Sequence, residues 1–346
     1  MYPNIPQDYV SLLHIYSEDH PDFLLPFLEA PLLKRLADID QNCGTHYCKF
    51  YDYKRKHVRL SHSLGVALII RHFTHDQKQT LAGLFHDISH SIFSHVGDFL
   101  LGDAENQESS EQYMIRLLFE DSIIMKELEK LRISIPEVDD YTLYPIADNH
   151  GPQLSADRLE YTLSSGLNMG KISLNQIKNI YNNITIVTNE DGVPEIGFTD
   201  KLLAKELALL ALDNDSNCFS SSKNTISMYF LAEIVRKMLD RKLLTPEQMY
   251  TWTDSQAIEC IENTGDTEIR DMRKFYKNLG TYKIYADKPE SDLFVVSSKN
   301  KRRYIDPLVK IDTTCTRVSK LYPDFYDMKE KHIHKQEEWI EIDWKV

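Results

Sequence analysis

The chain has 346 residues, of which 42% are hydrophobic, and its formal net charge is −13 at pH 7. This length and apolar content are sufficient for a substantial core, arranged as one large domain or two. The acidic charge argues against a general affinity for nucleic acid, because neutralising the phosphate backbone requires clustered Lys and Arg side chains.

The N-terminal segment is expected to be helical, with one interruption. Short helices are predicted over Phe23–Leu28 and Pro31–Leu36, the second of which has Pro in its first turn. The aromatic run Thr45–Tyr51 follows, and its partial alternation predicts a short strand or an extended loop. Apolar residues recur at helical spacing across 58–70, which places His62 near the start of a helix.

The stretch Leu81–His90 carries the most informative pattern in the chain. Apolar residues at helical spacing lead into the adjacent pair His86 and Asp87, and on a helix His90 would lie one turn beyond His86. An imidazole and a carboxylate aimed at one point suit a divalent ion, and Mn²⁺, Fe²⁺, Co²⁺, Ni²⁺ and Zn²⁺ all satisfy this pattern. Two ligands do not complete a site, so distant segments must supply the others.

The rest of the chain is predicted to be mainly helical, with two small groups of strands. The turn Asn189–Gly192 separates two β-prone runs and predicts a hairpin near 184–198. From about Gly280 the pattern changes to short strands, so a small α+β region is expected at the C-terminus. The predicted helices are 110–131, 154–167, 201–212, 226–239 and 246–261, and the predicted C-terminal strands are 282–285, 293–296 and 303–305.

His62, the His86-Asp87 pair and the later Asp157 form an ordered series with characteristic flanking residues. This combination resembles the HD-domain metal-dependent phosphohydrolases, and most resembles their deoxynucleoside triphosphate triphosphohydrolase branch, which includes the SAM- and HD-domain protein of vertebrates. The resemblance covers roughly Leu32 to Gly170. It rests on Arg59-x-x-His62, on the run from Ala82 to Asp98 that contains His86-Asp87, and on Asp157-Arg158-Leu159-Glu160-Tyr161.

The resemblance implies a mainly α fold and a division of the chain. Residues 1–215 would form an HD-type helical bundle that carries the metal site and the β-hairpin insertion. Residues 216–346 would form a helical extension and the α+β C-terminal region.

The resemblance also implies a divalent transition metal (Mn²⁺, Fe²⁺, Co²⁺, Ni²⁺ or Zn²⁺), alone or together with Mg²⁺. Two imidazoles and two carboxylates would leave coordination positions open for water and a phosphate oxygen, and the ion would lower the pKa of that water. The implied ligands are His62, His86, Asp87 and Asp157.

Further residues match family positions around the substrate. An imidazole that titrates near neutrality suits proton transfer or contact with phosphate. By resemblance, the catalytic group is His90, His95 and the supporting carboxylate Asp98, the nucleoside contacts are Gln41 and Tyr161, and the phosphate contacts are Arg59 and Arg158.

Two positions depart from the family. Ser110 stands where the triphosphohydrolases have a catalytic His, and Ser165 stands where they have an Asp near the sugar 3′-hydroxyl. The first expectation is a deoxynucleoside triphosphate triphosphohydrolase-like enzyme. The alternatives are a phosphomonoesterase or phosphodiesterase acting on another substrate, and a nucleotide-binding regulatory protein with reduced turnover. A nuclease fits poorly with the acidic charge.

Composition also bears on compartment and partners. The five Cys are scattered and contain no C-x-x-C pair, which favours free thiols. The first residues lack a basic and an apolar signal region, and no apolar run reaches membrane-spanning length. We therefore expect a cytoplasmic protein without a membrane partner. By resemblance to the family, a homo-oligomer is expected, with the C-terminal strands in the contact.

Overall fold

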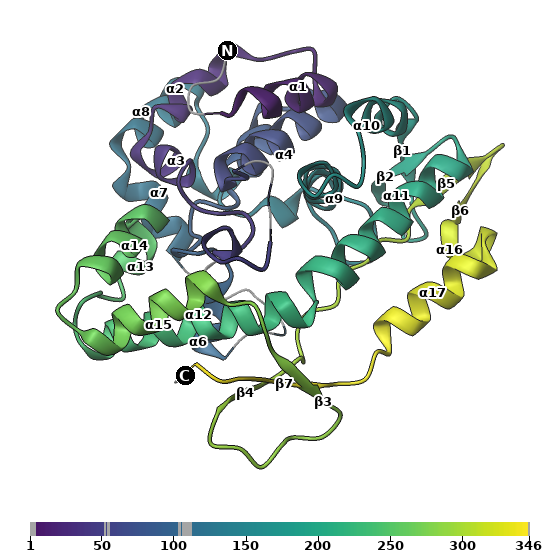
Figure 1. Cartoon of the computed structure of the whole chain (residues 1–346). Helices are drawn as coiled ribbons and strands as arrows, with labels where there is room; N and C mark the ends of the chain where they lie inside the picture. Colours follow the sequence, from purple (N-terminus) through teal and green to yellow (C-terminus); the bar gives the residue numbers. More distant parts are fainter. Residues whose placement is uncertain (1–4, 52, 54–55, 103–104, 106–112, 345–346) are drawn as a thin grey trace.

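The computed structural model describes residues 5–51, 53, 56–102, 105 and 113–344, and it is mainly helical (Figure 1). The predicted mainly α fold class is confirmed. The N-terminal elements are α1 (Gln7–Tyr16), η1 (Asp22–Leu24), α2 (Leu25–Leu28), α3 (Pro31–Leu36), η2 (Thr45–Tyr47), α4 (Arg59–Thr74), α5 (Gln77–Phe85), α6 (Val96–Leu101), α7 (Met114–Glu120), α8 (Ser122–Leu131), η4 (Ile135–Glu137), η5 (Tyr141–Leu143), α9 (Ala156–Asn168) and α10 (Leu174–Tyr181).

The C-terminal half alternates long helices with short strands. Its elements are β1 (Ile184–Thr188), β2 (Pro194–Phe198), α11 (Lys201–Asn214), the π-helical turn η6 (Asp215–Phe219), α12 (Ser222–Asp240), α13 (Gln248–Thr251), α14 (Asp254–Asn263), α15 (Thr267–Asn278), β3 (Lys283–Tyr285), β4 (Phe294–Ser297), β5 (Leu308–Ile311), β6 (Thr314–Arg317), α16 (Val318–Leu321), α17 (Pro323–Ile333) and β7 (Trp339–Ile342).

Helix α4 forms the centre of the N-terminal half. Every residue from Arg59 to Ile70 is buried, because α4 is covered by α1, α5 and α9. Figure 1 labels α1 and α9 on either side of α4. The approach of α5 is close: a Cβ atom at Gly83 would stand 2.3 Å from a methyl carbon of Ile70. Asp76 caps α5 by accepting the backbone N–H groups of Lys78 and Gln79. The close packing on α4 and the N-terminal cap together hold α5 in a fixed position against α4.

Two hydrophobic clusters make up the core. One surrounds α4, α5 and α9, and the other surrounds α12, α14 and α15. The segment 86–95 crosses between them, since Ile88 packs in the first cluster whereas Ile92 and Phe93 pack in the second. The clusters interleave along the sequence, because Ile305 and Phe325 also belong to the first. The domain division at residue 215 stays a prediction.

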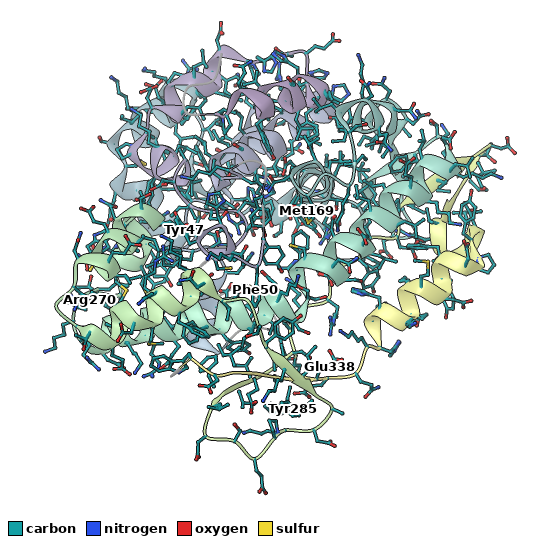
Figure 2. All side chains as sticks on the ribbon, in the orientation of Figure 1. Tyr47, Phe50, Met169, Arg270, Tyr285 and Glu338 are labelled. Carbon is teal, nitrogen blue, oxygen red and sulfur yellow. The ribbon has the colours of Figure 1, made fainter. Side chains whose placement is uncertain are left out.

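The strands form two small sheets. The predicted hairpin near 184–198 is confirmed: β1 and β2 are antiparallel, with Ile186 opposite Ile196. This hairpin is part of a four-stranded sheet of order β1-β2-β5-β6, in which β2 and β5 are parallel. The second sheet, of order β3-β7-β4, lies at the lower edge of the view in Figure 2, where Tyr285 of β3 is labelled.

Several predicted elements were wrong in detail. The helix expected through His90 ends at Phe85, and the following residues form tight turns in which Ile88 N–H bonds to Phe85 carbonyl. Thr45–Tyr51 contains a 3₁₀ turn and no strand. Residues 303–305 are not a strand, and β5 begins at Leu308.

Two predicted long helices are each broken by a capping residue. Within 110–131, Asp121 accepts the N–H groups of Ile123 and Ile124, so a new helix starts there. Within 246–261, Thr253 forms a capping box and separates α13 from α14. Helix α15 was not predicted.

Two expectations from composition can be compared with the described residues. All five Cys are free thiols. No described helix combines the length and apolar character that a membrane crossing requires.

Candidate metal centre

Three elements bring the proposed ligands to one point. His62 lies in the first turns of α4, and His86 and Asp87 follow directly after the end of α5. Asp157 lies in the first turn of α9, where Ser155 caps the helix. Because α4 is packed against both α5 and α9, the start of α4, the end of α5 and the start of α9 meet.

The donor atoms are close enough to share one cation. His62 Nε2 lies 3.2 Å from His86 Nε2 and 3.1 Å from Asp157 Oδ1. His86 Nε2 lies 3.4 Å from Asp87 Oδ1 and 3.7 Å from Asp157 Oδ1. Ligands held about 2.1 Å from a transition metal stand roughly 3.0–3.5 Å apart, so these separations fit such an ion. The structure therefore brings together the four residues proposed as ligands.

Hydrogen bonds turn the free nitrogen of each imidazole toward this point. His86 Nδ1 lies 2.8 Å from the carbonyl oxygen of Gly83, which can only accept, so His86 donates from Nδ1 and keeps a lone pair on Nε2. His62 Nδ1 lies 2.5 Å from a carboxylate oxygen of Glu160. Both rings thus present Nε2, as metal-binding histidines do when their other nitrogen donates elsewhere. Tyr141 stacks on His86 with ring centroids 4.8 Å apart.

Opposite charges control the ionisation of the centre. Burial alone would raise the pKa of Asp87, but Arg59, whose guanidinium lies 2.8 Å away, holds it well below its usual range. Burial would lower the pKa of His62, but hydrogen bonds to Asp157 and Glu160 outweigh burial and raise it to about 10. The carboxylates therefore attract positive charge to His62 Nε2, which is the electrostatic requirement for a cation site.

The side chains differ in their exposure. The exposed fractions are 2% for His62, 4% for His86 and 5% for Asp87, but 19% for Asp157 and 20% for His95. Asp157 and His95 are therefore the side chains of this group that solvent reaches most.

The predicted catalytic residues lie beside the centre. His90 Nε2 is 2.9 Å from Asp87 Oδ1. Asp98 accepts a hydrogen bond from His95 Nδ1 at 2.8 Å, and the rings of His90 and His95 are in edge-to-face contact. Burial lowers the pKa of His95 to about 3, although the hydrogen bond to Asp98 acts in the opposite direction. His95 is therefore neutral at neutral pH.

The phosphate-binding residues proposed from the sequence already have protein partners. Arg59 is buried, and it donates to Asp87 and to Ser94 at 2.9 Å. Arg158 donates to Asn149 at 2.7 Å and lies 3.0 Å from Asp148. In this structure Arg59 supports the carboxylate of Asp87, and its contact with a substrate stays a prediction.

The two residues proposed near the nucleoside have different surroundings. The buried side-chain oxygen of Gln41 has no hydrogen-bond donor among the described residues, so it can accept a bond from a ligand. Tyr161 is half-buried, and its ring contacts Phe219, over which Arg303 lies at 6.0 Å. Their roles stay predictions. The departure Ser165 is buried in α9, and Ser110 lies outside the described residues.

The sequence pattern did not single out the residues that support the ligands. Glu160 lies inside the family-like run, but no role was predicted for it, and the structure places it against His62. Tyr141 lies in a short 3₁₀ turn with no recognisable motif. The carboxylate three residues after Asp157, on the same helical face, was the one available signal for Glu160.

Comparisons with known proteins give a family match, two relatives and a solved structure of similar fold. Residues 59–137 match the HD domain family. The chain is 25% identical over 303 residues to the uncharacterized protein YdhJ of Bacillus subtilis strain 168, covering 86% of this chain and 87% of YdhJ. It is 28% identical over 303 residues to the metal-dependent phosphohydrolase cns2 of Cordyceps militaris, and the match covers 85% of this chain and 82% of cns2. A crystal structure of a phosphohydrolase from Bacteroides thetaiotaomicron VPI-5482 has the same fold, with a TM-score of 0.68 and 16% sequence identity. The match covers 94% of this chain and 96% of that chain.

Proposed function

From the HD-domain match and the phosphohydrolase relatives, which support a place in the HD-domain metal-dependent phosphohydrolase superfamily, we propose that this chain hydrolyses phosphate bonds of nucleotides. The observation that carries the proposal is the convergence of two imidazole Nε2 atoms and two carboxylates from three remote segments, with each carboxylate 3.1–3.7 Å from both nitrogens. A divalent ion at this point would supply an activated water and offset the charge that develops at phosphorus.

The side chains of this protein have distinct tasks in the proposed reaction. His62, His86, Asp87 and Asp157 would hold the ion, and Arg59 keeps Asp87 ionised and oriented. Because Asp98 accepts the Nδ1 proton of His95, Nε2 is left to exchange a proton with the substrate or water. A phosphate beside His95 would raise its pKa, because the negative charge favours the imidazolium. His95 would then be able to donate a proton to a leaving oxygen.

The nucleotide substrate rests on fewer observations. Gln41 offers a buried acceptor without a donor, and Tyr161 and Phe219 offer aromatic surfaces on the α9 side of the centre. Release of triphosphate from a deoxynucleoside triphosphate is the first reaction to test. Hydrolysis of a phosphomonoester or phosphodiester is the second, because Ser110 replaces the family histidine.

The test is a metal-resolved product screen. The purified chain is loaded separately with Mn²⁺, Fe²⁺, Co²⁺ or Ni²⁺ and incubated with deoxynucleotides, ribonucleotides, phosphomonoesters and phosphodiesters. Phosphate, pyrophosphate and triphosphate are then separated. We expect metal-dependent release of one of these from a nucleotide. Absence of release with every metal and substrate would contradict the proposal.

A regulatory protein with reduced turnover is the second candidate, and the Ser110 departure favours it. Calorimetry distinguishes the two, because a regulatory protein binds the nucleotide without hydrolysing it. In that case Ser110→His is expected to raise turnover, since it restores the family's catalytic imidazole.

A further inference from the structure

Glu160 is a completely buried carboxylate at the back of the metal centre. It lies one helical turn after Asp157 on α9, and its exposed fraction is 0%. Its Oε2 accepts from His62 Nδ1 at 2.5 Å and from Ser164 Oγ at 3.1 Å. Burying a carboxylate costs free energy unless hydrogen-bond donors surround it, so the donors around Glu160 are what make its burial possible.

The donors to the other oxygen come from helix α1. Tyr9 donates to Glu160 Oε1 at 2.7 Å, and the hydroxyl of Tyr16 lies 3.5 Å from the same atom. Since Tyr9 donates to Glu160, its oxygen must accept from Nε2 of His57, which lies 3.1 Å away. His57 Nδ1 then carries a bare lone pair, which agrees with its lack of a partner among the described residues. His57 therefore donates to Tyr9, and Tyr9 donates to Glu160.

The backbone of α4 leaves room for this carboxylate. A Cβ atom at Gly65 would stand 2.7 Å from Glu160 Cγ and 2.8 Å from Oε1, closer than side chains tolerate. Gly65 lies one turn after His62 on the same helix. The glycine thus allows Glu160 to reach the ring of His62 from behind.

We propose that Glu160 is a positioning residue for the metal centre, which holds the ring of His62 with Nε2 toward the cation, and that α1 completes the centre through Tyr9. The inference rests on the proposed metal-dependent function. Its physical basis is that a carboxylate on Nδ1 fixes both the tautomer and the orientation of a metal-binding imidazole and increases its basicity. Loss of such a partner weakens metal binding about 10- to 100-fold.

The test measures Mn²⁺ affinity by calorimetry on metal-free protein, without any turnover assay. Glu160→Gln keeps the side-chain size but removes the anionic acceptor, and it is expected to weaken Mn²⁺ binding about 10- to 100-fold. Tyr9→Phe removes one donor and leaves the carboxylate, so a smaller loss of affinity is expected. Because Tyr9→Phe changes a single hydroxyl, it keeps the inference testable if Glu160→Gln does not fold.

Matched controls separate positioning from stability. Asp215→Asn alters another fully buried carboxylate beside an imidazole, since Asp215 lies 2.9 Å from His332 Nε2. Tyr276→Phe removes another buried hydroxyl, which donates to Gly44 carbonyl. Both are expected to lower the unfolding temperature and to leave Mn²⁺ affinity unchanged.

The outcomes are distinct for the two proposals. Wild-type affinity in both Glu160→Gln and Tyr9→Phe would overturn the positioning role alone. Equal losses of affinity in the control variants would also overturn it, because general destabilisation would then explain the effect. If the wild-type chain binds no divalent metal, the proposed function itself fails.

Discussion

At the scale of single residues, the interior of this protein contains an unusual concentration of charge. Asp87, Asp157 and Glu160 converge on His62, and Arg59 is the nearest guanidinium. Buried charges persist only when each is paired, and strongly shifted pKa values in such a cluster are typical of functional sites. A functional role therefore explains this cluster of charges better than a contribution to the stability of the fold does.

Asp157→Ala is expected to weaken divalent metal binding at least about 100-fold, because it removes a ligand rather than a supporting partner. Hydrolysis should decrease with the bound metal. Metal content after dialysis and phosphate release are the measurements. Asp191→Ala, in the exposed turn between β1 and β2, is the control and should retain wild-type metal content. Full metal content in Asp157→Ala would remove Asp157 from the ligand set.

His95→Ala is expected to lower kcat about 10²- to 10⁴-fold with little change in metal content, because His95 contacts Asp98 and not the proposed ligands. Asp98→Asn should also lower kcat, but by a smaller factor, since the imidazole of His95 stays in place. Steady-state kinetics at saturating metal measure both. An unchanged kcat in His95→Ala would exclude His95 as the proton-transfer group.

At the scale of elements, the segment 86–95 departs from helix although its apolar spacing is helical. Phe93 and Ser94 have φ values of 58° and 56°, a left-handed conformation that is costly for residues other than Gly. Polar contacts hold the segment: Arg35 donates to the carbonyl groups of Ile88 and His90, and Asp254 accepts the N–H of Phe93. The turns carry the chain from the first hydrophobic cluster, where Ile88 packs, to the second, where Ile92 and Phe93 pack.

The anchor Asp254 makes stability depend on pH. Burial raises its pKa to about 8 from 3.8, although backbone hydrogen bonds from Phe93 and Asp40 oppose this. The folded state therefore binds a proton that the unfolded state releases above about pH 4. The free energy of unfolding is expected to decrease as pH rises from about 4 to 8.

Urea denaturation across this pH range measures the dependence on Asp254. Asp254→Asn is expected to destabilise the fold by about 1–3 kcal/mol, because an amide cannot accept both N–H groups. The informative quantity is the slope of the unfolding free energy against pH, which should be smaller in Asp254→Asn than in the wild type. The same slope in both proteins would assign the dependence to other groups.

At the scale of the whole molecule, the C-terminal strands β5 and β6 fold back on the β1–β2 hairpin. Strand β5 pairs in parallel with β2, and Arg317 at the end of β6 contacts Glu195 at 2.5 Å. Glu195 is completely buried and also accepts the N–H of Leu154, just before α9. Strands β5 and β6 thus support the segment that leads into α9, the helix that carries Asp157.

Arg317→Ala is expected to lower the free energy of unfolding by about 3–5 kcal/mol, because it leaves Glu195 buried without its cation. Replacing both residues, as in Glu195→Gln with Arg317→Met, should recover part of this loss. Chemical denaturation of Glu195→Gln, Arg317→Met and the double variant measures the coupling. Independent, additive effects would show that the pair does not join the two parts of the chain.

The sequence by itself determined the helical character, the hairpin and which residue types are able to bind a metal. These are local properties: apolar spacing, turn residues and the His-Asp pair act within a few residues. The pattern did not predict the end of α5 at Phe85, because backbone contacts from Arg35 and Asp254, 50 and more residues away, compete with helical propensity there.

Only the tertiary structure decided how the centre is assembled. The distance of 3.1 Å between His62 and Asp157 depends on the packing of α4 against α9, which no local pattern encodes. The place of Glu160 behind His62, the hydroxyl of Tyr9 from α1 and the parallel pairing of β2 with β5 arise in the same way. The physical reason is that burial and long-range hydrogen bonding, rather than the periodicity of the chain, select which polar side chains meet in the interior.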